Sequence, residues 1–156
     1  MLEIYVDADA CPVKDEVMRV GERHGLAIHM VGNSWMRLDG ATSVNRVVVP
    51  EGLDAADDWI AEHIGAGDIA ITADTRLAAR CLARGARVLG HTGRPFTDDS
   101  ISMALAMRDL NEYLRDAGEI RGGGPAFSRK DRSRFLEALE QMVQSLKREN
   151  PRSAGR

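Results

Sequence analysis

Short apolar runs alternate along the first 90 residues with longer segments that place apolar side chains at helical spacing. The apolar runs predict strands, and they lie at residues 4–6, 26–31, 44–49, 68–72 and 86–90. The periodic segments predict helices, and they lie at residues 12–24, 54–64 and 75–84. Strands that alternate with helices form a parallel sheet with right-handed crossovers and helices on both faces. The pattern therefore predicts an α/β fold with a mainly parallel sheet of about five strands.

The rest of the chain predicts helices rather than further strands. Residues 91–97 are expected to form a loop, and a helix is expected over about 98–116 because its apolar residues recur at helical spacing. Ser128, with Asp131 three residues later, is typical of a helix start, and that last helix is expected to reach about residue 149.

One domain accounts for this pattern. It is expected to span residues 1–149 and to include a C-terminal helical arm from about residue 118. Residues 150–156 have too little apolar content to pack, so we expect a disordered tail there.

Composition narrows the class of protein. Of the 156 residues, 44% are apolar and 29% are charged, and the net charge of −3 gives no general attraction to nucleic acids or anionic membranes. No apolar run approaches the roughly 20 residues that cross a bilayer, and no signal-peptide profile is present. Cys11 and Cys81 are too few for a disulfide scaffold and are expected to be reduced thiols. We therefore expect a cytoplasmic protein without a membrane partner.

Aspartates follow two of the predicted strands directly. Asp7 and Asp9 come after the first strand, and Asp74 comes after the fourth, with the hydroxyl of Thr72 nearby. The carboxyl ends of parallel strands open onto the crevice where ligands bind, so these carboxylates converge if the two strands are neighbours. Like charges held together require a proton or a cation between them, and Mg²⁺ prefers carboxylate oxygens. The alternative is that each aspartate is solvated or caps a helix.

The helix predicted at 54–64 brings further acidic residues. Asp54 is expected to cap this helix, and the helix dipole favours negative charge there. Asp57 or Asp58 could instead face the crevice as a further metal ligand.

Basic residues suggest where an anionic substrate could bind. Lys14 follows Asp9 by about one helical turn and could contact a phosphate. A group of basic residues near the glycine-rich segment at 122–125 could hold a nucleic-acid backbone; they are Arg121, Arg129, Lys130, Arg132 and Arg134. Arg108 stands in an apolar helical stretch and is expected to pair with a carboxylate. Solvated surface positions are the alternative for Lys14 and for the gathered residues.

Several short motifs resemble those of the YaiI/YqxD family of bacterial proteins. They are VDADACPVK at 6–14, DAAD at 54–57, GDIAITAD at 67–74, MRD at 107–109 and GGGP at 122–125. The resemblance spans nearly the whole chain. That family is in turn similar to the PIN-domain nucleases, which have a three-layer α/β/α sandwich and bind Mg²⁺ or Mn²⁺ through acidic residues at the strand ends.

The resemblance implies a metal-dependent nuclease that acts on RNA. Asp7 matches the first PIN aspartate, Asp74 the later one, and Asp57 the acidic residue of the middle helix. Catalysis would then fall to Asp7, Asp9 and Asp74, metal binding to these and Asp57, and substrate contacts to Lys14, Thr72, Arg108, Arg129 and Lys130. The motif DACPVK at 9–14 and the arm from Gly118 are absent from ordinary PIN domains.

Three other functions compete with the nuclease. A phosphatase of the haloacid-dehalogenase type would use Asp7 as nucleophile and Asp9 as acid/base, with Asp68 and Asp74 as the later acidic pair. A PIN-like module could bind metal and RNA, or a protein, without cutting. A cysteine nucleophile built on Cys11 is the third alternative.

Overall fold

The computed structural model describes residues 2–9, 11–33, 44–50, 54–103, 105–107 and 127–149. They form one sheet in the order β3-β2-β1-β4-β5-β6. Its strands are β1 (Glu3–Asp7), β2 (Ala27–Gly32), β3 (Val44–Val48), β4 (Ile69–Ile71), β5 (Arg87–Leu89) and β6 (Pro95–Phe96). The first five are parallel, and only β6 runs antiparallel to its neighbour. The predicted α/β fold with a mostly parallel sheet is therefore confirmed.

The sheet has six strands instead of about five, because part of the loop predicted at 91–97 forms β6. The chain turns back after β5, where Gly90 N–H donates to Arg94 O at 2.9 Å and Gly93 adopts a φ of +88°. A strand of two residues is too short to show any periodicity in sequence, which is why the pattern missed it.

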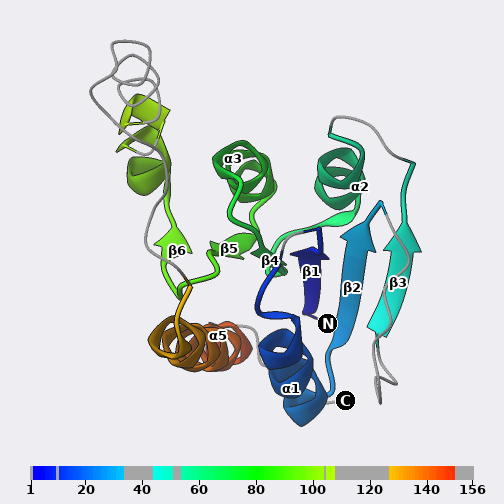
Figure 1. The fold of residues 1–156 in the computed structure, drawn as a ribbon, viewed down its shortest axis with the longest axis vertical. Helices are drawn as coiled ribbons and strands as arrows, with labels where there is room; N and C mark the ends of the chain where they lie inside the picture. Colours follow the sequence, from blue (N-terminus) through cyan, green and yellow to red (C-terminus); the bar gives the residue numbers. More distant parts are fainter. Residues whose placement is uncertain are drawn as a thin grey trace.

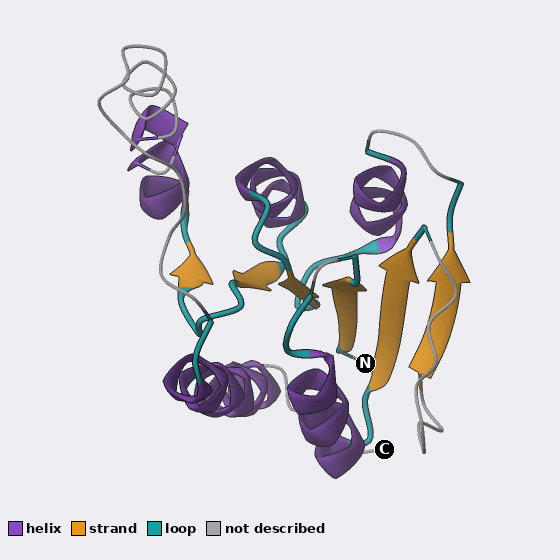
Figure 2. Ribbon diagram, in the orientation of Figure 1, coloured by secondary structure: helices purple, strands orange, loops and turns teal. Residues whose placement is uncertain are grey.

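Four helices cover the sheet. They are α1 (Lys14–His24), α2 (Ala55–His63), α3 (Thr75–Ala83) and α5 (Arg129–Glu149). Figure 1 shows α1 and α5 on one face of the sheet and α2 and α3 on the other. Residues 98–103 and 105–107 are also helical, and Figure 2 shows this helix standing apart from the sheet beyond β6.

Two apolar cores hold these elements together, one on each face of the sheet. Side chains alternate along β1, so Ile4 and Val6 join the core beneath α1 and α5, whereas Tyr5 joins the core beneath α2 and α3. The stripe of α5 that enters the first core recurs every three or four residues, and it consists of Phe135, Leu139, Val143 and Leu146.

The predicted helix starts are confirmed at two places. The Asp74 carboxylate accepts hydrogen bonds from the amides of Arg76 and Leu77 and so caps α3. At the start of α5, the Ser128 hydroxyl accepts from the Asp131 amide while the Asp131 carboxylate accepts from the Ser128 amide.

Several sequence predictions fall outside the described residues. Among them are the second half of the helix expected at 98–116, the glycine-rich segment at 122–125 and the tail at 150–156. Arg108 and Arg121 also lie outside them. Within the described ranges, no helix combines the length and apolar character needed to cross a membrane.

Candidate active site

The strand order reverses between β1 and β4, which are hydrogen-bonded neighbours. The connection after β1 leads toward β2, whereas the connection after β4 leads toward β5 on the other side. A crevice therefore opens at the carboxyl ends of β1 and β4, and ligands of open α/β sheets bind at such a point. Asp7 is the last residue of β1, and Thr72 directly follows β4. The aspartates are expected to converge if the first and fourth predicted strands are neighbours, and this condition is met.

The hydroxyl of Thr72 connects Asp7 with Asp74. It donates to Asp7 Oδ2 at 3.1 Å and accepts from the Asp74 amide at 3.0 Å. Because Thr72 is completely buried, its position is fixed by the core around it. Asp74 is then oriented by its own cap, since its Oδ1 accepts from Arg76 N at 2.8 Å. Two carboxylates 67 positions apart in the chain are therefore held in a defined relation.

A small cavity of about 150 Å³ lies beside this connection, and we call it the acidic cleft. Its polar lining residues are Asp7, Asp9, Asn33, Asp54 and Asp57. Asp9 is exposed, and its Oδ2 accepts a hydrogen bond from the Asn33 amide at 3.0 Å. A Cβ on Gly32 would approach Asp9 Oδ1 to 2.8 Å, so the glycine makes room for this carboxylate at the end of β2.

Mutual repulsion and burial change the acidity of the cleft. Burial, together with the nearby carboxylates of Asp74 and Asp7, raises the pKa of Asp57 to about 6. Burial also raises the pKa of Asp7, with Asp74 and Asp9 adding to this effect and the Thr72 hydrogen bond opposing it. Carboxylates from β1, from α2 and from the start of α3 therefore sense one another's charge. The arrangement favours a proton or a cation among them.

The acidity of Asp57 predicts a pH-dependent stability in metal-free protein. Its pKa is about 6 in the folded chain and 3.8 ordinarily, so the folded state holds this proton more tightly. The stability that results is complete below pH 4 and is lost as the pH rises through 6. We expect Asp57→Asn to raise the free energy of unfolding at pH 8 by about 1 kcal/mol, a value reduced for solvent screening, and to leave it unchanged near pH 4.

Urea unfolding in EDTA at the two pH values measures this difference. Asp58→Asn is the matched control, because Asp58 lies on the same helix and pairs with Arg80 at 2.8 Å. It is expected to give no stabilisation at pH 8. If the free energy of unfolding changes with pH in the same way in Asp57→Asn and in the unaltered protein, the pKa of Asp57 is not raised by folding.

The donor chemistry of the cleft suits a hard divalent cation, since every charged residue in its described lining is an aspartate. In the described part of the chain, no three histidine, cysteine, aspartate or glutamate side chains are arranged so that they could together hold a metal ion as they lie. Mg²⁺, however, commonly binds through one or two carboxylates and completes its shell with water and substrate phosphate. The residues thus fit this ion by chemistry and charge.

Asp54 does not cap α2 as predicted. It occupies the residue before the helix, but its side chain accepts no capping hydrogen bond, and its φ is +68°. Such a backbone conformation is uncommon for a residue other than glycine. The carboxylate lines the acidic cleft instead.

The predicted basic residues lie near this edge of the sheet but outside the cleft. Arg129 and Lys130 are exposed on the first turn of α5, and Lys14 is half-buried at the start of α1. The two helix starts meet, because Arg132 donates to the carbonyl of Pro12 at 2.6 Å. Arg132 also lies 3.5 Å from Glu16, so it serves this contact and is not free for a substrate.

The alternative chemistries have weaker geometry. Asp68 lies at the amino end of β4, where it accepts from the amides of Glu3 and Gly65, so it cannot join Asp7 as the phosphatase requires. Burial raises the pKa of the Cys11 thiol, which disfavours a thiolate nucleophile. Sequence reasoning missed Asn33, because its place in the cleft depends on how β2 ends and no local motif signals it.

Comparison with known proteins places this geometry in a family. A family model described as "Uncharacterized BCR, YaiI/YqxD family" matches residues 5–145. A UPF0178 protein of Parvibaculum lavamentivorans is 64% identical over 151 residues, covering 97% of this chain and 99% of its own length. UPF0178 proteins of Rhodospirillum rubrum and Rhizobium etli are 57% and 54% identical, covering 94% and 92% of this chain and 99% and 93% of their own. No solved structure matches the chain significantly.

Proposed function

This chain belongs to the YaiI/YqxD family, and from the acidic cleft at the reversal of its sheet we propose that it is a divalent-metal-dependent nuclease that hydrolyses RNA. The observation that carries the proposal is the electrostatic coupling of Asp7, Asp57 and Asp74 beside the buried Thr72 hydroxyl. A three-layer, PIN-like arrangement and action in the cytoplasm are parts of the same proposal.

The carboxylates of Asp7, Asp9, Asp57 and Asp74 would hold Mg²⁺ or Mn²⁺. When bound, such an ion makes a bound water a stronger nucleophile and neutralises charge on the phosphodiester. Thr72 keeps Asp7 oriented toward the cleft through its hydrogen bond of 3.1 Å. The α3 cap keeps Asp74 in one position, so neither carboxylate has to be ordered when the ion binds.

Substrate contacts would come from the basic residues at this edge of the sheet. Lys14, Arg129 and Lys130 carry the positive charge that the acidic cleft lacks. Phosphate contacts by such residues are sensitive to salt and indifferent to sequence. Arg129 and Lys130 are exposed and form no ion pair with another described residue, which suits this role.

One observation favours a second candidate, a module that binds RNA without cutting it. The described carboxylates are not arranged so that three of them already hold one ion, as a dedicated metal centre would require. In this candidate, Lys14, Arg129 and Lys130 would still bind the RNA backbone, but no phosphodiester bond would be hydrolysed.

Cleavage of a labelled single-stranded RNA, measured with Mg²⁺, with Mn²⁺ and in EDTA, tests the proposal. The expected result is shortening of the RNA with either metal and none in EDTA. Salt-sensitive binding without turnover under any divalent metal would replace the nuclease by the binding module. A phospho-aspartate trapped at Asp7 with small phosphate esters would overturn both.

A further inference from the structure

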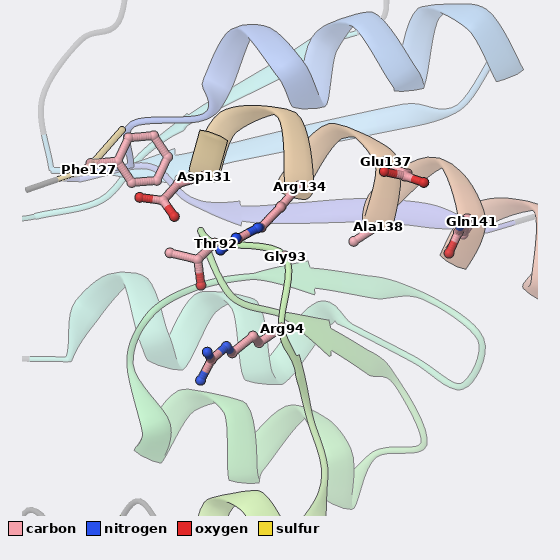
Figure 3. Close-up of a pocket in the computed structure, with 9 residues that line it drawn as sticks. All are labelled: Thr92, Gly93, Arg94, Phe127, Asp131, Arg134, Glu137, Ala138 and Gln141. Carbon is pink, nitrogen blue, oxygen red and sulfur yellow. The ribbon is translucent and has the colours of Figure 1, made fainter. Parts of the chain in front are cut away.

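Two larger cavities adjoin one another at the carboxyl ends of β4 and β5. The inner cavity measures about 530 Å³, and its lining includes Ala73, His91, Arg94, Phe96, Ser100 and Phe127. The outer cavity measures about 850 Å³ and lies between the turn after β5 and the first half of α5 (Figure 3). Thr92, Arg94 and Phe127 line both, so the two cavities adjoin at these residues. Both volumes are in the range of about 300–1,000 Å³ typical of small-molecule sites.

The inner cavity begins next to the acidic residues. Ala73, which lines it, is exposed and stands in the chain between Thr72 and Asp74, the two residues that anchor the carboxylates of the candidate site. A polymer with one phosphate near Asp74 would therefore have its neighbouring residue at this cavity.

Charge distinguishes the inner cavity from the outer one. The outer cavity contains Arg94 and Arg134 but also Asp131 and Glu137. Among the described residues, the lining of the inner cavity includes Arg94 and no aspartate or glutamate. Arg94 is exposed, and its side chain forms no hydrogen bond or ion pair with any other described residue. Figure 3 shows it extending from the turn after β5, away from Arg134. The inner cavity thus complements an anion.

Aromatic surface gives the inner cavity a second property. Phe96 and Phe127 are half-buried there, and the Arg132 guanidinium lies 5.1 Å from the centre of the Phe127 ring. Because this contact already holds the Phe127 ring in place, the ring would lose little side-chain freedom on contact with a base. Nucleobases of single strands bind on such aromatic surfaces beside cationic grooves.

His91 supplies a ring nitrogen that is unpaired among the described residues. It lines the inner cavity, and its Nε2 is buried without a hydrogen-bond partner among the described residues. Buried polar groups are nearly always paired, so an unpaired one calls for an explanation. Burial lowers the pKa of His91 below its ordinary 6.5, and the neutral ring offers one donor and one acceptor.

We propose that the inner cavity is a nucleotide subsite, in which Phe127 and His91 contact the base and Arg94 the phosphate of the residue next to the cleaved bond. The proposal rests on the proposed function for the position of that bond, and it specifies a single-stranded substrate. A paired base would not be free to enter the cavity.

Binding without catalysis tests the subsite separately from the nuclease. We would measure fluorescence anisotropy of a labelled uridine hexanucleotide in EDTA with the full chain. Arg94→Ala is expected to weaken binding about tenfold and to lower the salt dependence by about one phosphate contact. Phe127→Leu keeps apolar volume in the core and is expected to weaken binding about fivefold. Arg19→Ala, an exposed arginine of α1 that lines neither cavity, is the matched control and is expected to bind normally.

Ring signals of the four histidines provide a direct site readout. With uridine 5′-monophosphate, the NMR signals of His91 are expected to shift while those of His24, His29 and His63 stay in place. Binding that depends on Arg94 and Phe127 supports the subsite even if no metal produces cleavage. Equal binding by Arg94→Ala, Phe127→Leu and the unaltered chain overturns it, even if RNA is cut. The proposal is also overturned if a duplex binds as tightly as the single-stranded hexanucleotide. It is overturned as well if inorganic phosphate displaces the hexanucleotide as effectively as uridine 5′-monophosphate does.

Discussion

Asp74→Asn is expected to lower the rate of metal-dependent RNA cleavage by about 100- to 1,000-fold. The substitution removes one of the charges that would hold the ion, and metal-ion stabilisation of a transition state is worth several kcal/mol. The fold should stay intact, because the asparagine oxygen can accept the same hydrogen bonds from Arg76 and Leu77. Asparagine is as good as aspartate at the start of a helix. Cleavage rates at saturating Mg²⁺, together with thermal unfolding, measure both effects.

Two companion variants separate charge from capping. Asp74→Ala removes the charge and the cap, so it is expected to lose the same activity and in addition about 1 kcal/mol of stability. Asp15→Asn removes an exposed aspartate from the first turn of α1 and should change neither quantity. Full activity in Asp74→Asn would show that this carboxylate is not part of the catalytic centre.

Phe135→Ala is expected to lower the free energy of unfolding by about 3–5 kcal/mol. The Phe135 side chain is completely buried where α5 meets the sheet, in the same core as Ile4 and Val6 of β1. Removing the ring loses its transfer from water and leaves a cavity. Because domains are stable by only about 5–15 kcal/mol, the variant is expected to be partly unfolded at moderate temperature. Guanidinium unfolding curves measure the change.

Glu137→Ala provides the control for Phe135→Ala. It lies two residues later on the same helix but is exposed, so its effect is expected to stay within about 0.5 kcal/mol. A loss below 1 kcal/mol for Phe135→Ala would mean that α5 does not seal this face of the sheet.

Short sequence patterns predicted the strand and the helix starts that depend on residues close together in the chain. The apolar, partly β-branched run before Asp7 forms a strand that is buried on both faces, as its sequence indicates. Asp74 and Ser128 mark helix starts because a side-chain oxygen pairs with amides a few residues later, a relation visible in sequence. The sequence left open whether the first and fourth strands are neighbours and made the convergence of the aspartates depend on it; the strand order meets that condition.

The remaining features depend on contacts that no local motif contains. Asp54 has the residue type and position of a cap, yet its backbone turns into the left-handed region and its side chain lines the cleft. Asn33 reaches the cleft only because β2 ends beside Asp9. The position of Arg94 depends on the turn between β5 and β6, which packs against α5. In this turn the backbone of Gly93 approaches Arg134 too closely for any side chain. Such placements follow from tertiary packing, which residue spacing does not record.

The cover that α5 provides for β1 has a consequence for protein synthesis. A ribosome that has translated residues 1–128 has already delivered every aspartate of the acidic cleft. Yet Ile4 and Val6, on the strand that carries Asp7, still lack the apolar partners that come from Phe135 and Leu139. Under the proposed function, the nascent chain is therefore expected to gain nuclease activity only when α5 emerges, so that incomplete chains do not cut RNA beside the ribosome.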